Sequence, residues 1–181
     1  MNTKRSLVLI FLVLMMVQGA CTASADACPA STIDTELLTD TEDGYCLLYP
    51  TKYSTEVPDY IVINPVSAPG DQLGDAWVSI ETEAAAGRTA AQVADAQISS
   101  AGSGFNITRT EASVDGEPAV VVDGLPGPDS WRKVFIVHNQ RLYTLTFLPW
   151  QPAVEGAGQQ PPLEGLYTMI MQSLHFLPTE S

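Results

Sequence analysis

The chain has 181 residues, of which 45% are hydrophobic and 16% are charged. It carries only 8 Lys and Arg against 21 Asp and Glu, which gives a formal net charge of -13 at pH 7. The electric field of so acidic a chain repels phosphate backbones and anionic membrane surfaces. It therefore excludes nucleic acid as a partner and direct adhesion to a membrane. Cations and basic partners remain possible. No feature of the sequence calls for a cofactor.

The first twenty residues have the layout of a secretory signal peptide. Lys4 and Arg5 supply a positive start, and Leu7 to Val17 is an unbroken apolar run. That run is too short to cross a bilayer as an ordinary anchor. Removing this leader leaves roughly 130 to 155 residues, the size of one domain. We therefore expect an exported protein with residues 1–20 as the signal peptide.

Two sites of cleavage are consistent with the end of this leader. Gly19-Ala20-Cys21 resembles a bacterial lipobox, in which the cysteine is lipidated and becomes the new N-terminus. Gln18 departs from that pattern, which prefers an aliphatic residue there. In the other interpretation a signal peptidase cuts after Ala25 or Ala27 and Cys21 is lost. The first predicts an outer-face lipoprotein, with the membrane contacted only through its lipid anchor, and the second an extracellular protein. We expect its partner to be an envelope protein or a small ligand.

Both interpretations leave Cys28 and Cys46 as a pair. Exported chains meet oxidising conditions, so a Cys28–Cys46 disulfide is expected rather than two free thiols. Thr22 to Gly44 is rich in small and acidic residues. It predicts a lipid-anchored or flexible acidic arm over residues 21–44, followed by a globular domain over 45–178.

The domain alternates strand patterns with two helical ones. Thr89 and Gln92 form a capping-box pattern before a helix of about 12 residues that ends at Gly102. Leu163, Leu166, Tyr167, Ile170 and Leu174 share one face of a closing helix. Asp115-Gly116 and Asn139-Gln140 are turn signals between strands. The predicted strands are Tyr45 to Pro50, Tyr60 to Pro65, Ala76 to Glu83, Phe105 to Val114, Glu117 to Leu125, Trp131 to Asn139 and Arg141 to Trp150.

Runs of adjacent strands with helices at their margins predict an α+β fold. We expect a central antiparallel sheet of about six to seven strands flanked by helices. The segments that carry a family resemblance are YCLLYPTKYS, GRTAAQVADAQ, DGEPAVVVDG, KVFIVHNQRLYTLTF and LEGLYTMIMQSLHF. In this order they resemble the PsbP-like sandwich, which is shared with the Mog-type nuclear import factor and with short bacterial lipoproteins. The resemblance would cover Tyr45 to Phe176 and implies an accessory or binding protein.

No catalytic or metal-binding signature is present in the sequence. His138 at a hairpin tip and His175 at the end of the closing helix stand in no metal-ligand spacing, so we interpret them as a polar turn residue and a helix-end cation. Glu81 and Glu83 share an outward strand face, which favours a solvated surface over acid–base chemistry. These residues leave two alternatives to an accessory domain, namely a secreted Asp/Glu enzyme and a cation-binding domain that uses the acidic arm.

Trp131 and Trp150 mark the outer ends of the last hairpin. Exposed tryptophans at these positions would form a binding patch. The alternative is that both rings pack against the neighbouring loops.

Overall fold

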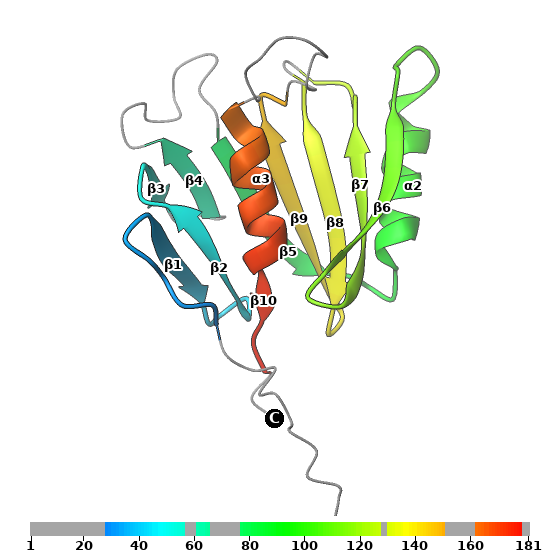
Figure 1. Cartoon of the computed structure of the whole chain (residues 1–181). Helices are drawn as coiled ribbons and strands as arrows, with labels where there is room; N and C mark the ends of the chain where they lie inside the picture. The colour runs from blue at the N-terminus through cyan, green and yellow to red at the C-terminus, as the bar shows by residue number, and fades with distance from the viewer. Residues whose placement is uncertain (1–27, 57–60, 66–76, 128–129, 151–161, 179–181) are drawn as a thin grey trace, which may run out of the picture.

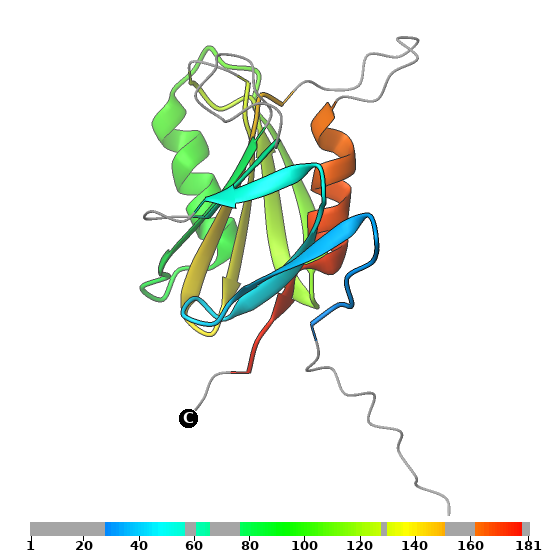
Figure 2. The same ribbon diagram turned by 90° about the vertical axis from the view of Figure 1, so that its left-hand side faces the viewer.

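The structure is a sheet with a helix on each face. A computed structural model describes residues 28–56, 61–65, 77–127, 130–150 and 162–178. Its centre is a seven-stranded antiparallel sheet in the order β3-β4-β5-β9-β8-β7-β6. Figures 1 and 2 show helix α2 on one face of this sheet and helix α3 on the other. The elements are β3 (Tyr53–Glu56), β4 (Ile61–Pro65), β5 (Trp77–Ala84), α2 (Ala90–Ala101), β6 (Thr108–Val114), β7 (Glu117–Asp123), β8 (Arg132–His138), β9 (Arg141–Leu148) and α3 (Pro162–Ser173).

A second, smaller sheet lies beside α3. It consists of β1 (Thr35–Asp40), β2 (Tyr45–Pro50) and β10 (His175–Phe176), in the order β1-β2-β10. Tyr45, Leu47 and Tyr49 alternate along β2 and are all buried. They belong to the same apolar cluster as the buried face of α3, so this small sheet and α3 together cover one face of the large sheet.

The two faces of the large sheet have separate cores. On the α3 side, Tyr143, Leu145 and Phe147 from β9 pack with residues of β2 and α3. On the α2 side, a smaller cluster joins Val93 and Ala94 of the helix to Phe135 of β8. The sequence expectation of an α+β fold with a central antiparallel sheet is confirmed. No helix in these described ranges is long and apolar enough to cross a membrane.

Turn chemistry fixes the register of the hairpins. Asn139 and Gln140 have φ values of 46° and 64°, and Asp115 and Gly116 have 50° and 80°. Two successive residues with positive φ define the turn that matches the twist of an antiparallel hairpin. The capping box of α2 is present as well: the Gln92 N–H donates to Thr89 Oγ1, and the Thr89 N–H donates to Gln92 Oε1.

The prediction of an arm that ends at Gly44 is wrong for its second half. Thr35–Asp40 forms β1 and pairs antiparallel with the whole of β2. The strand is half exposed and polar, so its sequence lacks the alternation that identifies a strand. Its turn is held by Asp40, whose Oδ1 accepts the Glu42 and Asp43 N–H groups.

Three further expectations need correction. Tyr45–Pro50 is a strand as predicted, but it lies in the small sheet, and the edge position of the large sheet is taken by β3. The strands β3, with 4 residues, and β10, with 2, are absent from the predicted strands, because neither is long enough to show an alternating pattern. The closing helix stops at Ser173, because the Ser173 hydroxyl accepts the Leu48 N–H of β2 and the chain then pairs with that strand.

The predicted Cys28–Cys46 disulfide is present and closes a loop with a sequence separation of 18. On the chain-entropy model such a loop stabilises the fold by about 3 kcal/mol. We expect replacement of both cysteines by alanine to lower the free energy of unfolding by about that amount, measured by urea denaturation. Cys21→Ala is the matched control and should leave the midpoint unchanged. Equal stability of the double variant and the parent would contradict the bridge.

Buried tyrosines make stability sensitive to alkaline pH. Burial raises the pKa of Tyr45, Tyr53, Tyr143 and Tyr167 above the ordinary value of 10.0. The folded state keeps these protons while the unfolded state loses them, so their contribution is complete below pH 10.0 and is lost as the pH rises through the raised values. We expect tyrosinate absorbance to appear together with loss of the circular dichroism signal. Phenols that ionise near pH 10.0 with the fold intact would contradict this.

Candidate functional site

A polar groove runs along the edge of α2. The helix contacts β7 and β8 but leaves the same face of β9 and β5 uncovered by any described helix. The resulting cavity has a volume of about 780 Å³. We call it the α2 groove; its helix wall is formed by Val93, Ala96, Gln97 and Ser100, and its sheet side by Glu81, Glu83, Lys133, Leu142 and Thr144.

The sequence of α2 explains why the groove remains open and is lined by polar groups. Only the narrow stripe of Ala90, Val93 and Ala94 is buried, and alanine brings the helix close to the sheet without filling space beyond it. Gln97 and Ser100 lie farther along the helix and place amide and hydroxyl groups in the groove wall. The floor is Leu142 and Thr144 of β9.

One end of the groove is closed by a satisfied ion pair. The Arg88 side chain donates to the Ala85 carbonyl at 3.0 Å and to Glu83 Oε1 at 3.2 Å. Both side chains are about half exposed or more, so the pair is worth little to stability. Its effect is to neutralise Glu83, whereas Glu81 forms no ion pair with any described residue.

Lys133 is the unusual residue of the site. It projects from β8 on the face that also carries buried Phe135, so its ammonium group is partly withdrawn from water. Burial lowers the pKa of Lys133 below 10.5, and the negative charge of Glu81 opposes that effect. Its described neighbour is the Trp131 ring, with the ammonium nitrogen 5.0 Å from the ring centre. No ion pair to Lys133 exists among the residues that the structure describes.

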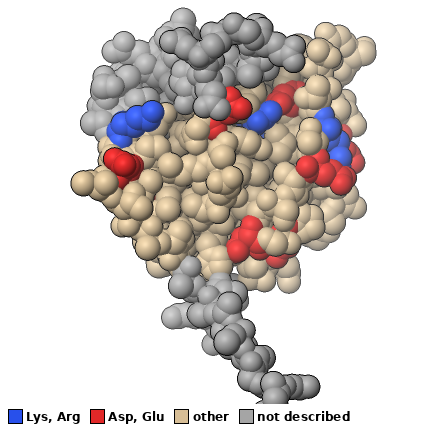
Figure 3. Space-filling view, in the orientation of Figure 1, with Lys and Arg blue, Asp and Glu red and all other residues tan. Residues whose placement is uncertain are grey.

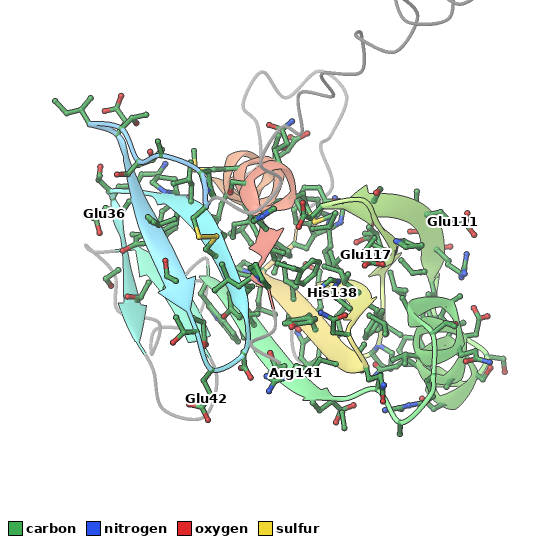
Figure 4. All side chains as sticks on the ribbon, turned by 90° about the horizontal axis from the view of Figure 1, so that it is seen from below. Glu36, Glu42, Glu111, Glu117, His138 and Arg141 are labelled. Atoms are coloured by element: carbon green, nitrogen blue, oxygen red, sulfur yellow. A yellow bond between two sulfur atoms is a disulfide. The ribbon has the colours of Figure 1, made fainter. Side chains whose placement is uncertain are left out.

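A second cavity lies where the β1–β2 and β8–β9 turns meet. This end of the domain is opposite the first turn of α3. The cavity has a volume of about 750 Å³ and is lined by residues that include Glu42, Asp43, His138 and Arg141. Figure 4 looks onto this end, with Glu42, Arg141 and His138 labelled. Its Arg141 is already engaged: the guanidinium donates to Asp43 Oδ1 at 2.7 Å and to the Glu42 backbone carbonyl at 3.0 Å. The Tyr143 hydroxyl donates to the Asp43 carbonyl.

The tryptophans do not form the exposed patch that one interpretation predicted. Trp150 is 6% exposed and packs in the α3-side core. The Arg132 guanidinium lies 3.7 Å from the centre of its ring. Trp131 is half-buried, with its ring directly over Gly127. Packing against neighbouring segments is therefore the correct alternative for Trp150, and the contacts of Trp131 favour it too.

Both histidines are bonded to carboxylates beside the β6–β7 turn. His138 Nδ1 lies 2.8 Å from Glu117, and its ring stacks on Phe176 at 4.3 Å. His175 Nδ1 lies 2.9 Å from Asp115. The prediction that His175 ends a helix is wrong, because it belongs to β10. These contacts attach the C-terminal strand β10 to the β6–β7 turn and to the β8–β9 turn. Within the described ranges no three His, Cys, Asp or Glu side chains converge to hold a metal ion.

Sequence reasoning placed Glu81 and Glu83 on an outward face, and the structure leaves both exposed. It missed Lys133, although a signal was available. Lys133, Phe135 and Val137 alternate along one strand and share one face, so a lysine occupies a position where the pattern requires an apolar residue. Cys21 lies outside the described residues.

Charges on the α3 side are mostly paired. Figure 3 shows a largely uncharged surface on which the blue Lys and Arg side chains lie beside red Asp or Glu side chains. On this side Arg132 donates to Asp123. On the α2 side, Arg109 of β6 is paired with Asp95 of α2 and with Glu111. The α2 groove brings Glu81 and Lys133 into one cavity, and neither forms an ion pair with a residue that the structure describes.

The layers and the strand order define an α+β sandwich domain. Among solved structures, the chain is similar to the solution structure of cyanobacterial PsbP (CyanoP) from Synechocystis sp. PCC 6803, with a TM-score of 0.51. The match covers 83% of this chain and 97% of that one at 16% sequence identity. This likeness shows the fold, which is PsbP-like as the sequence predicted. No family model and no curated protein sequence matches the chain.

The partly buried charge of Lys133 gives a direct test of the groove. Because the folded pKa is lowered, the charged form disfavours the fold at neutral pH, and this cost disappears as the pH rises toward 10.5. We expect Lys133→Met to keep or raise the midpoint of urea unfolding at pH 7. NMR titration of the lysine side chains should find one midpoint below 10.5 that is missing in the variant. A marked loss of stability would show that Lys133 has a partner.

Proposed function

We propose that the protein is an exported, lipid-anchored accessory domain of the cell envelope that binds a partner or a small ligand and performs no catalysis. The observation that carries the proposal is the Cys28–Cys46 disulfide. It uses two of the 3 cysteines and belongs to an oxidising compartment. Cys21 is then the remaining cysteine, directly after Gly19-Ala20 at the end of an apolar leader.

The disulfide also restricts where an anchored domain can lie. Cys28 is bonded to Cys46 of β2, so the tether effectively ends on the folded domain at that strand. Cys28 lies seven positions after Cys21, and a fully extended chain spans about 25 Å over that length. The disulfide adds a Cα–Cα distance of 5.9 Å. Lipidation at Cys21 would therefore hold Cys46 of β2 within about 31 Å of the lipidated cysteine.

The alternative of a secreted enzyme that uses Glu81 and Glu83 has less support. Both carboxylates are exposed, and Glu83 is bonded to Arg88. General acid–base catalysis by a carboxylate usually requires burial that shifts its pKa toward the working pH. The fold neighbour provides no catalytic residue to compare, because the likeness at 16% identity concerns the fold alone.

The intact mass of the protein from the membrane fraction of its native host tests the proposal. We expect, without reductant, a chain that begins at Cys21, carries acyl groups and is two hydrogens lighter than the reduced form. Cys21→Ala should release the protein from the membrane fraction and leave the disulfide intact. Cys28→Ala is the matched control and should remain membrane-bound. An unlipidated mass that begins at Asp26 or Cys28 would contradict anchoring.

A further inference from the structure

We infer that the α2 groove binds a small zwitterion, an amino acid or short peptide, with its carboxylate at Lys133 and its ammonium group at Glu81. The inference rests on the proposal that this is a ligand-binding domain, but it does not depend on the lipid anchor. It deepens that proposal by naming the class of ligand.

The first step is the contrast between two consecutive residues of β8. Arg132 points to the α3 side, where it donates to both Asp123 oxygens at 2.8 and 2.7 Å. It also lies 3.7 and 4.7 Å from the ring centres of Trp150 and Tyr167. Lys133 points to the α2 side and forms no ion pair with any residue that the structure describes, although the Glu81 charge acts on it at longer range. A partly buried cation without a bonded counter-charge is costly, and a ligand carboxylate at Lys133 would lower that cost.

Glu81 supplies the opposite charge within the same cavity. In the sheet register Glu81 pairs with Thr144 of β9, while Lys133 pairs with Thr146 two residues further along that strand. With strands about 4.8 Å apart and a rise of about 3.4 Å per residue, the two Cα atoms lie about 12 Å apart. Glu81 affects the pKa of Lys133, yet the two side chains form no ion pair. The space between the charges suits a ligand that carries both.

Neutral hydrogen-bonding groups surround this space. Gln97, Ser100 and Thr144 line the groove between the helix and the sheet. Thr146, the cross-strand neighbour of Lys133, is 5% exposed and does not line the groove, so Thr144 is the β9 residue that offers a hydroxyl to a ligand there.

Other ligand classes fit the charges less well. A simple anion meets the field of a protein with a net charge of -13 as well as the Glu81 carboxylate. A simple cation leaves Lys133 without a counter-charge. An uncharged polyol satisfies hydrogen bonds but neutralises neither group. A net-neutral molecule with separated charges avoids all three penalties.

The test uses the purified mature chain with its disulfide intact and NMR titration of backbone amides. The zwitterionic probes are glycine, β-alanine, 4-aminobutanoic acid and glycylglycine, which differ in the spacing between the charges. Acetate, methylammonium and glucose are the single-charge and uncharged comparisons. We expect saturable shifts around Glu81, Gln97 and Lys133 for the zwitterions, with an optimum spacing and an affinity at least tenfold above that for the comparisons.

Variants assign the charges. We expect Glu81→Gln and Lys133→Met each to weaken the best zwitterion at least tenfold, whereas Lys133→Arg retains most of the affinity. Glu81→Gln should leave the weak binding of acetate unchanged or stronger, which separates loss of one charge from loss of the fold. Glu111→Gln and Lys52→Met change exposed charges outside the groove and are the matched controls.

Three results would overturn the inference: glucose binding as tightly as any zwitterion, shifts confined to the second cavity around Arg141, or no saturable shift with any probe. None of these would alter the mass expected for a chain lipidated at Cys21. Conversely, a freely secreted mass would leave the groove titration unaffected. Failure of the ligand assignment and failure of the anchoring proposal are therefore distinguishable.

Discussion

The structure depends on one constraint: a seven-stranded sheet with apolar residues on both faces must be covered on both sides. Seven strands span about 29 Å, whereas one helix is about 10 Å wide and covers about two of them. The chain supplies one 12-residue helix to each face. On the α3 side the three-stranded sheet covers the remainder, and β2 contributes two tyrosines and a leucine to that core. On the α2 side no described strand or helix supplements α2, and the groove is what remains beside it.

This unequal covering explains why the charged residues of the two faces differ. On the α3 side, the partly buried guanidinium of Arg132 is bonded to both carboxylate oxygens of Asp123 and lies against two aromatic rings. Such a cation is fixed in place and unavailable to a ligand. Lys133 is the next residue along the same strand, but the face to which it points is only half covered. The alternation of a β-strand therefore places a satisfied charge and an unsatisfied one side by side in sequence and on opposite sides of the sheet.

The sequence predicted the elements that carry strong periodicity or turn chemistry. The helix capped by Thr89, the hairpin at Asn139-Gln140 and the apolar face of Leu163, Leu166 and Ile170 follow local rules that tertiary contacts do not change. The strand Thr35–Asp40 could not be predicted in this way, because it is paired on one side only and remains half exposed. Its strand conformation comes from pairing with β2, a partner that periodicity in its own residues cannot reveal.

The candidate site was predicted only in part, for a related reason. Glu81 was recognised as outward-facing from the alternation of its strand, but nothing local indicates that α2 stops short of it. The depth of a groove depends on where a helix comes to rest, and this follows from the small size of Ala90 and Ala94 together with the bulk of Phe135 beneath them. Local pattern therefore identifies which side chains share a face. Only the packing of the helix shows that Glu81 and Lys133 share a cavity, in which neither forms an ion pair with a described residue.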